Sequence, residues 1–249
     1  MRFDRTRLLV GDEGMERLAG ATVAIFGLGG VGSYALEAVA RAGVGRLILV
    51  DADVVESSNI NRQLIALENT VGRPKVEVAR ERVGQINPDA RVEAVREFIG
   101  PENADRLLGE FHGYAIDAID SVESKVHLLV ALRARAAALV SCMGAGNRCA
   151  LAPVRVGDIS RTTGCPLARQ VRQRLRRLGV STGIRCAYFA EPPAPAAARG
   201  PQPSISYVPG MLGLTAAGLI VNDILAAPAD SRPGGPVSPD GPHRGGNEA

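Results

Sequence analysis

The stretch Ala21-Thr-Val-Ala-Ile-Phe-Gly-Leu-Gly-Gly-Val-Gly-Ser33 indicates the fold of this chain. A short apolar run, typical of a buried strand, leads into glycines and then into a segment with helical character. Glycines at such a turn let the backbone approach a phosphate, and the following helix offers free N–H groups and its positive dipole end. A purely structural turn is the alternative. The nucleotide-binding candidates here are Gly27, Gly29, Gly30, Gly32 and Ser33.

Working outward, apolar runs alternate with segments of helical periodicity. Strands are predicted at 21–26, 46–50, 91–95, 114–119 and 139–142, and helices at 31–42, 74–86, 101–111 and 121–137. This order predicts an α/β fold with a doubly wound, Rossmann-like, mostly parallel sheet and right-handed crossovers. Beyond residue 144 we predict a C-terminal mixed α/β extension. Its strands are expected at 148–156, broken at Pro153, and 184–189, and its helices at 165–178 and 210–225.

The domain organisation expected is a single unit over 1–226. Its nucleotide-binding core covers about 20–144, and a substrate-facing part covers about 145–226. A Pro- and Ala-rich stretch at 191–203 is expected to be a mobile loop, and 227–249 a disordered tail.

Composition is ordinary for a soluble globular protein: 249 residues, 46% hydrophobic and 22% charged, with a net charge of +3. The start of the chain carries no signal-peptide pattern. No stretch reaches the roughly 18 apolar residues of a membrane span, and the nearest, 211–226, contains Asn222 and Asp223. A cytoplasmic enzyme is therefore expected. The four cysteines form no CxxC pair, so no structural zinc and no disulfide framework are expected.

The residues after the second strand favour a triphosphate over a dinucleotide. Asp51 ends that strand, where an acid can accept hydrogen bonds from ribose hydroxyls. A polar segment, 51–63, follows, and Arg73 and Lys75 then stand at the start of the next helix. Cations are useful where charge grows on a pyrophosphate leaving group, and hydride transfer has no need of them.

These motifs together resemble the adenylation site of ubiquitin-activating-type enzymes, the ThiF, MoeB and HesA group. The resemblance covers nearly the whole folded chain. It implies ATP and magnesium, with Asp51 on the ribose and Asp120 as the magnesium-binding aspartate. It also implies a homodimer in which Arg5 is lent to the neighbouring active site. The nucleotide-binding set that it implies adds Asp53, Asn59, Arg62, Gln63 and Lys75.

Each of these residues also has a plain alternative. Arg62 fits a solvated surface charge, and Asp53 a residue that shapes its loop. Lys75 fits a helix-start cation, although a positive helix end makes an anionic partner more plausible. Asp120 fits a helix N-cap, because Asp-Ser-Val-Glu precedes an apolar run. Arg5 fits a disordered terminal charge.

Later motifs, at 143–147, 156–162, 166–172 and 208–210, resemble the transfer RNA threonylcarbamoyladenosine dehydratases. That resemblance implies ATP-dependent adenylation of the threonyl carboxylate on the modified adenosine beside the anticodon, followed by closure to an oxazolone. Such a ring closure needs no enzyme nucleophile, so no cysteine is expected to be essential. One departure is that Cys165 stands where an aspartate is expected.

A local excess of arginine favours an RNA partner. Arg161, Arg169, Arg172 and Arg176 are the candidate tRNA contacts, and only Asp158 is acidic nearby. Such a patch suits a phosphate backbone, whereas the alternative is a helix whose arginines pair within the protein. Relatives sometimes associate with sulfur-transfer proteins, so a partner of that kind stays open.

Three rival functions remain at this stage. An adenylyltransferase for a ubiquitin-like sulfur carrier shares the ATP site and differs in substrate. An NAD-dependent oxidoreductase and a non-catalytic RNA-binding module are the others.

Overall fold

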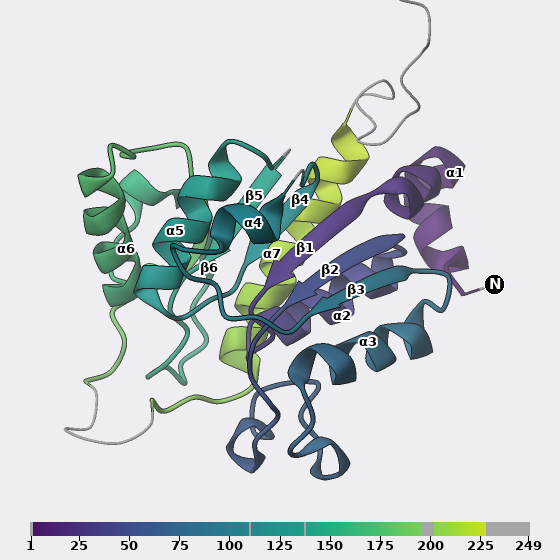
Figure 1. The fold of residues 1–249 in the computed structure, drawn as a ribbon, viewed down its shortest axis with the longest axis horizontal. Coiled ribbons are helices and arrows are strands. Elements are labelled where there is room, and N and C mark those ends of the chain that lie inside the picture. The colour runs from purple at the N-terminus through teal and green to yellow at the C-terminus, as the bar shows by residue number, and fades with distance from the viewer. Residues whose placement is uncertain (1, 110, 137, 196–201, 228–249) are drawn as a thin grey trace, which may run out of the picture.

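The computed structural model describes residues 2–109, 111–136, 138–195 and 202–227. A seven-stranded sheet runs through the molecule in the order β3-β2-β1-β4-β5-β7-β6 (Figure 1). All neighbouring pairs are parallel except β6 with β7. The strands are β1 Thr22–Phe26, β2 Arg46–Val50, β3 Arg91–Val95, β4 Tyr114–Asp117, β5 Ala138–Cys142, β6 Val154–Asp158 and β7 Arg185–Phe189.

Helices cover both faces of this sheet, as a doubly wound fold requires. The helices are α1 Asp4–Gly20, α2 Gly32–Ala42, α3 Lys75–Ile86, α4 Ala104–Leu108, α5 Val122–Arg133, α6 Pro166–Arg177 and α7 Tyr207–Ala226. One core layer joins the sheet to α1, α2, α3 and α7, and the other joins it to α4, α5 and α6. The predicted α/β, mostly parallel fold with a mixed C-terminal part is confirmed.

Strand register aligns the carboxyl ends of the central strands. Phe26 lies opposite Val50 on one side and Asp117 on the other. The chain order reverses between β1 and β4, so this edge is the topological switch point where open α/β sheets bind ligands. The turns that leave β1, β2 and β4 therefore meet at one place.

Several elements end earlier or later than predicted. The strand expected at 114–119 ends at Asp117, because its carboxylate accepts the N–H of Ile119 and turns the chain. The strand expected at 148–156 forms instead at Val154–Asp158, beyond Pro153, which lacks the N–H that a ladder needs. The helices expected at 101–111 and 121–137 shorten to α4 and α5.

Helix α1 was not predicted from the sequence, where a disordered terminal charge was one of the two interpretations of Arg5. The helix forms, with a kink at Gly11, whose φ is 73°. Only Gly14, Met15 and Leu18 are buried, so its apolar periodicity is weak. That shortage of buried positions explains why the pattern gave no signal.

Helix α7 begins earlier than the predicted residue 210, at Tyr207. Among the described residues, α7 is the one helix that is long and apolar enough to span a membrane. Half of it, however, is buried inside the protein. Its buried positions include Val208, Leu212, Ala216 and Ile220 and belong to the main core. Residues 196–201 of the predicted loop, and 228–249 of the predicted tail, lie outside the described residues.

The close packing of α7 on α2 depends on Gly213, which lies against the helix backbone. A Cβ there would lie 2.2 Å from the carbonyl oxygen of Val31 and 3.0 Å from the nitrogen of Ala35. Gly213→Ala is therefore expected to lower the free energy of unfolding by about 1–3 kcal/mol, measured by urea denaturation. Gly218→Ala, in the same helix with nothing within 4 Å, is the matched control. It is expected to raise that free energy by about 0.5–1 kcal/mol, and equal effects of the two changes contradict this account.

Candidate functional site

The glycine loop after β1 leaves no room for a side chain at two of its glycines, Gly27 and Gly32. Gly27 has a φ of +87°, and a Cβ there would lie 2.9 Å from the carbonyl oxygen of Ala118. A Cβ on Gly32 would lie 1.8 Å from the carbonyl oxygen of Gly27. Gly29, by contrast, meets nothing closer than the amide of Gln63 at 4.0 Å. Two glycines therefore allow the loop to close on itself, and Gly29 leaves open space at the start of α2 for a ligand.

Asp51 braces this loop from the neighbouring strand. Its Oδ2 accepts the N–H of Leu28 at 2.6 Å, and its Oδ1 accepts the N–H of Asp53 at 2.9 Å. Burial raises the pKa of this carboxyl, outweighing the nearby Lys75 cation and the two backbone donors. A carboxylate has lone pairs beyond these two bonds, so it can still accept ribose hydroxyls.

The polar segment after β2 folds over the loop. The Ser33 hydroxyl accepts the N–H of Leu64 at 3.0 Å and so ties the segment to α2. Buried Asn59 accepts the N–H of Glu56 at 3.1 Å. Arg62 donates to the carbonyl oxygen of Ser58 at 2.9 Å and lies beside Gly30, where a Cβ would be 3.4 Å from its Cγ. Arg62 therefore lies beside the glycines and is not a free surface charge.

Lys75 finds its anionic partner within the protein. It is 5% exposed, and its Nζ donates to Oδ2 of Asp53 at 2.8 Å. Its backbone N–H donates to the carbonyl oxygen of Asp53 at 3.0 Å. The Asp53 side chain is 68% exposed, so one partner is fixed and the other lies at the surface.

Gln63 lies near Gly29 and has an acceptor without a partner. The residue is 6% exposed, and its Oε1 is buried without a hydrogen-bond partner. Buried polar groups rarely stay unpaired, and a ligand donor is one way to satisfy such an oxygen.

The turn after β4 carries Asp120. Ala118 donates its N–H to Phe26 at 2.8 Å, so this turn lies against the glycine loop. Asp120 is exposed, and it is not the N-cap of α5, because that position belongs to Ser121. Below the turn, Asp117 forms a buried ion pair with Lys125, which was not among the residues predicted from the sequence. The signal that could have revealed it is a lysine eight positions after an aspartate at a strand end.

The remaining predicted residues lie away from the loop or have local roles. Arg5 is exposed on α1. Arg161, Arg169 and Arg176 are exposed on and before α6. Arg172 is different, because it donates to the carbonyl oxygens of Ile159 at 3.3 Å and Thr162 at 2.9 Å.

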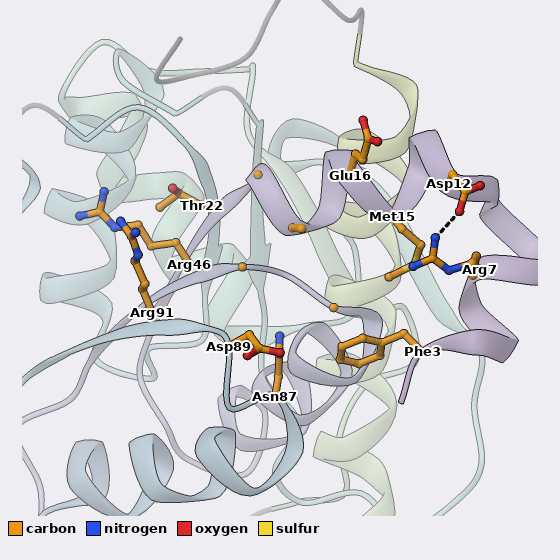
Figure 2. A pocket seen from close by; sticks show the side chains of 14 residues that line it. Phe3, Arg7, Asp12, Met15, Glu16, Thr22, Arg46, Asn87, Asp89 and Arg91 are labelled. Carbon is orange, nitrogen blue, oxygen red and sulfur yellow. Dashed lines mark hydrogen bonds and ion pairs between the residues drawn. The ribbon is translucent and has the colours of Figure 1, made fainter. Parts of the chain in front are cut away.

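A cavity of about 920 Å³ lies at the opposite edge of the sheet. It is lined by Thr22, Arg46 and Arg91, the first residues of their strands, as well as by Arg7 and Asp12 of α1. Figure 2 shows Arg46 and Arg91 side by side and the ion pair between Arg7 and Asp12. Because ligands of open α/β sheets bind at the carboxyl edge, this cavity is not the nucleotide site.

Comparison with known proteins agrees with this geometry. The model of the ThiF family matches residues 3–241. The tRNA threonylcarbamoyladenosine dehydratase of Bacillus subtilis is 38% identical over 240 residues, which cover 90% of this chain and 94% of that one. The crystal structure of Escherichia coli TcdA, the same kind of enzyme, in complex with ATP has a TM-score of 0.84 and 35% identity, covering 90% and 94% of the two chains.

A sulfur carrier protein adenylyltransferase of Thermus thermophilus is 40% identical over only 126 residues, half of this chain and 46% of that one. The likeness to the dehydratases covers nine-tenths of the chain, whereas the likeness to the adenylyltransferase covers half of it. On these grounds the chain belongs to the ThiF family and, within it, to the tRNA threonylcarbamoyladenosine dehydratases.

Proposed function

We propose that this chain binds ATP at the carboxyl edge of β1, β2 and β4 and uses it to dehydrate threonylcarbamoyladenosine in tRNA. The observation that carries the proposal is the glycine loop, with open space at Gly29, beside two cations and an unpaired Gln63 oxygen. Relatives that share nine-tenths of the chain are named for this reaction, and one of them was crystallised with ATP.

In the first step, a carboxylate oxygen of the threonyl group attacks the α-phosphorus of ATP. The bond from that phosphorus to the bridging oxygen breaks, and pyrophosphate leaves with the electron pair. Lys75 and Arg62 lie beside the loop, where positive charge stabilises the phosphates as charge builds up on the leaving group. Asn59 completes the phosphate contacts, with Asp51 on the ribose, and the unpaired Gln63 Oε1 is free to accept a donor of the nucleotide.

Magnesium fits this site as an ion held mostly by phosphate oxygens. Within the described residues, no three His, Cys, Asp or Glu side chains gather as a metal cage. Mg²⁺ bound with nucleotides needs only one or two protein carboxylates, and exposed Asp120 offers one near the loop. When bound, the ion would neutralise charge on the phosphates.

In the second step, the ureido oxygen attacks the adenylated carbonyl carbon, the bond to AMP breaks, and the ureido nitrogen gives up its proton. The nucleoside loses one water in total. Because nucleophile and electrophile belong to one molecule, proximity replaces an enzyme nucleophile. Buried Cys165, 5% exposed, has no part in this scheme.

A homodimer would complete the site. Leu8 and Leu9 on α1 are 88% and 86% exposed, which is unusual for leucines and marks a surface suited to a partner. Arg5 lies on the same helix. A second copy that covers this helix would bring its Arg5 toward a neighbouring site.

The arginines of α6 would contact the tRNA backbone. Arg169, Arg174, Arg176 and Arg177 are exposed, and none of the four makes an ion pair with any residue that the structure describes. Arg172 supports the same surface from below. With tRNA as its substrate, the enzyme would act in the cytoplasm, and the part beyond residue 144 would face the RNA.

The direct test incubates the protein with ATP, magnesium and threonylcarbamoylated tRNA. The nucleoside is expected to lose one water mass, and AMP to appear in equal amount. Asp120→Asn is expected to lower kcat about 100- to 1000-fold while ATP binding measured by calorimetry persists. Asp89→Asn, an exposed acid at the opposite edge, is the control and should keep full activity. AMP formation driven by a diglycine-tailed carrier protein, and not by tRNA, would favour the sulfur-carrier alternative.

A mixing experiment tests Arg5 as a residue given to the partner. Arg5→Ala and Asp120→Asn homodimers are each expected to be nearly inactive. Subunit exchange makes heterodimers in which one site regains both groups, so an equal mixture should recover about a quarter of wild-type activity. If mass spectrometry verifies subunit exchange and activity does not recover, Arg5 acts in the active site of its own subunit or in no active site.

The arginine surface is tested by the salt dependence of tRNA binding. Arg169→Ala/Arg176→Ala is expected to weaken binding and reduce the slope of log K against log salt by about 1.5–2. Arg80→Ala/Arg106→Ala removes equal charge from exposed positions on α3 and α4 and should leave the slope unchanged. Equal slopes in all three proteins would remove α6 from the RNA interface.

A further inference from the structure

A buried ion pair lies below the turn of Asp120 and has no part in the reaction described above. Lys125 Nζ donates to Asp117 Oδ2 at 2.6 Å, and the Ser141 hydroxyl donates to the same oxygen at 2.6 Å. All three residues are 0% exposed. They come from α5, β4 and β5, so the cluster joins three elements.

Stability alone does not account for this cluster. Removing two charges from water has a large desolvation cost, and apolar residues of similar volume often stabilise a protein as well or better. What apolar residues cannot do is fix the orientation of a carboxylate. Lys125 and Ser141 hold one oxygen of Asp117, and this leaves the other oxygen directed at the chain beyond the strand.

That other oxygen controls the turn. Asp117 Oδ1 accepts the N–H of Ile119 at 3.1 Å, one residue before Asp120. On the opposite side, the N–H of Ala118 donates to the carbonyl oxygen of Phe26. The carbonyl oxygen of Ala118 is 2.9 Å from where a Cβ of Gly27 would lie. The turn is therefore held between the buried pair and the glycine loop, with Asp120 at its outer end.

The Lys125 charge has Asp117 as its anionic partner. Two thiols, Cys142 on β5 and Cys186 on β7, interact electrostatically with Lys125. Burial raises the pKa of Cys142 to about 12 and raises the pKa of Cys186 further. Both thiols are neutral near pH 7, so neither competes with Asp117 for the lysine.

We propose that Lys125 and Ser141 are positioning residues for adenylation, because they lock Asp117 and thereby place the Asp120 carboxylate within reach of the metal on the bound triphosphate. The inference rests on the proposed function and deepens it. It assigns to a cluster outside the site the task of aligning the metal-binding acid with the phosphate loop.

The test compares the full chain with the Asp117→Asn/Lys125→Met double variant, which removes both charges and leaves neither unpaired. The probe is Mn²⁺ with an ATP analogue whose α,β-bridge is methylene, followed by electron paramagnetic resonance. The Mn²⁺ dissociation constant is expected to rise about 10- to 100-fold, as when outer partners of a metal ligand are lost. The affinity for the analogue without metal should stay within about threefold, and kcat should fall about 100-fold.

The matched control is Arg185→Met/Asp223→Asn, which removes another ion pair, 32% and 27% exposed, between β7 and α7. It should keep wild-type Mn²⁺ affinity, which is measured without RNA. A folded Asp117→Asn/Lys125→Met protein with wild-type Mn²⁺ affinity overturns the proposal. Parallel loss of nucleotide and metal affinity also overturns it, since that is the mark of a purely structural role.

Ser141→Ala keeps the question decidable if the double variant fails to fold. It removes a single hydrogen bond to Asp117, and the Mn²⁺ dissociation constant should rise about threefold or more with folding retained. An unchanged constant counts against the proposal. Wild-type protein that binds Mn²⁺ with the analogue but never dehydrates tRNA refutes the proposed function alone, because the metal comparison does not use RNA.

Discussion

The structure depends on the close approach of three backbone turns at one edge of the sheet. The turn after β1 reaches the turn after β4 so closely that only glycine fits at 27, and it doubles back on itself so tightly that only glycine fits at 32. Neither contact is possible unless β1 and β4 end in register, which the pairing of Phe26 with Asp117 provides. The strand register and the glycines are thus two parts of one constraint.

Two carboxylates, the half-buried Asp51 and the buried Asp117, maintain that arrangement from both sides of β1. Asp51 directly follows β2, and its carboxylate accepts the N–H groups of Leu28 and Asp53. Asp117 is the last residue of β4, and its carboxylate accepts the N–H of Ile119. Each therefore fixes backbone N–H groups next to the glycine loop. The difference lies in their surroundings: Asp51 keeps partial access to a ligand, whereas Asp117 is sealed and neutralised by Lys125. In the proposed function the first carboxylate contacts the nucleotide directly, and in the proposed positioning role the second acts through the turn that it holds.

The sequence predicted what local pattern determines. The strands predicted at 46–50 and 91–95 match the observed strands residue for residue. Each is a short run bounded by turn residues, and each forms a parallel strand. Helix α1 was missed, since its apolar residues are few and Gly11 breaks its period. The partner of Lys75 was suspected to be an anion but not identified as Asp53, and the bond between Ser33 and Leu64 had no signal at all. Such contacts join residues more than twenty positions apart, and only the folded chain brings them together.

The cations of the site are already bonded, which bears on how a triphosphate would enter. Lys75 is 6% exposed in its side chain and held by the fold, while Asp53 is largely in solvent. In the proposed function, an arriving phosphate would take the place of the exposed Asp53 carboxylate at the buried Lys75, and the displaced carboxylate would regain full hydration. Arg62 is bonded to the carbonyl of Ser58, a neutral acceptor that competes weakly with a phosphate oxygen. Both cations are thus preorganised by bonds that a phosphate can replace at small cost, and this suits a site that must bind ATP and later release AMP.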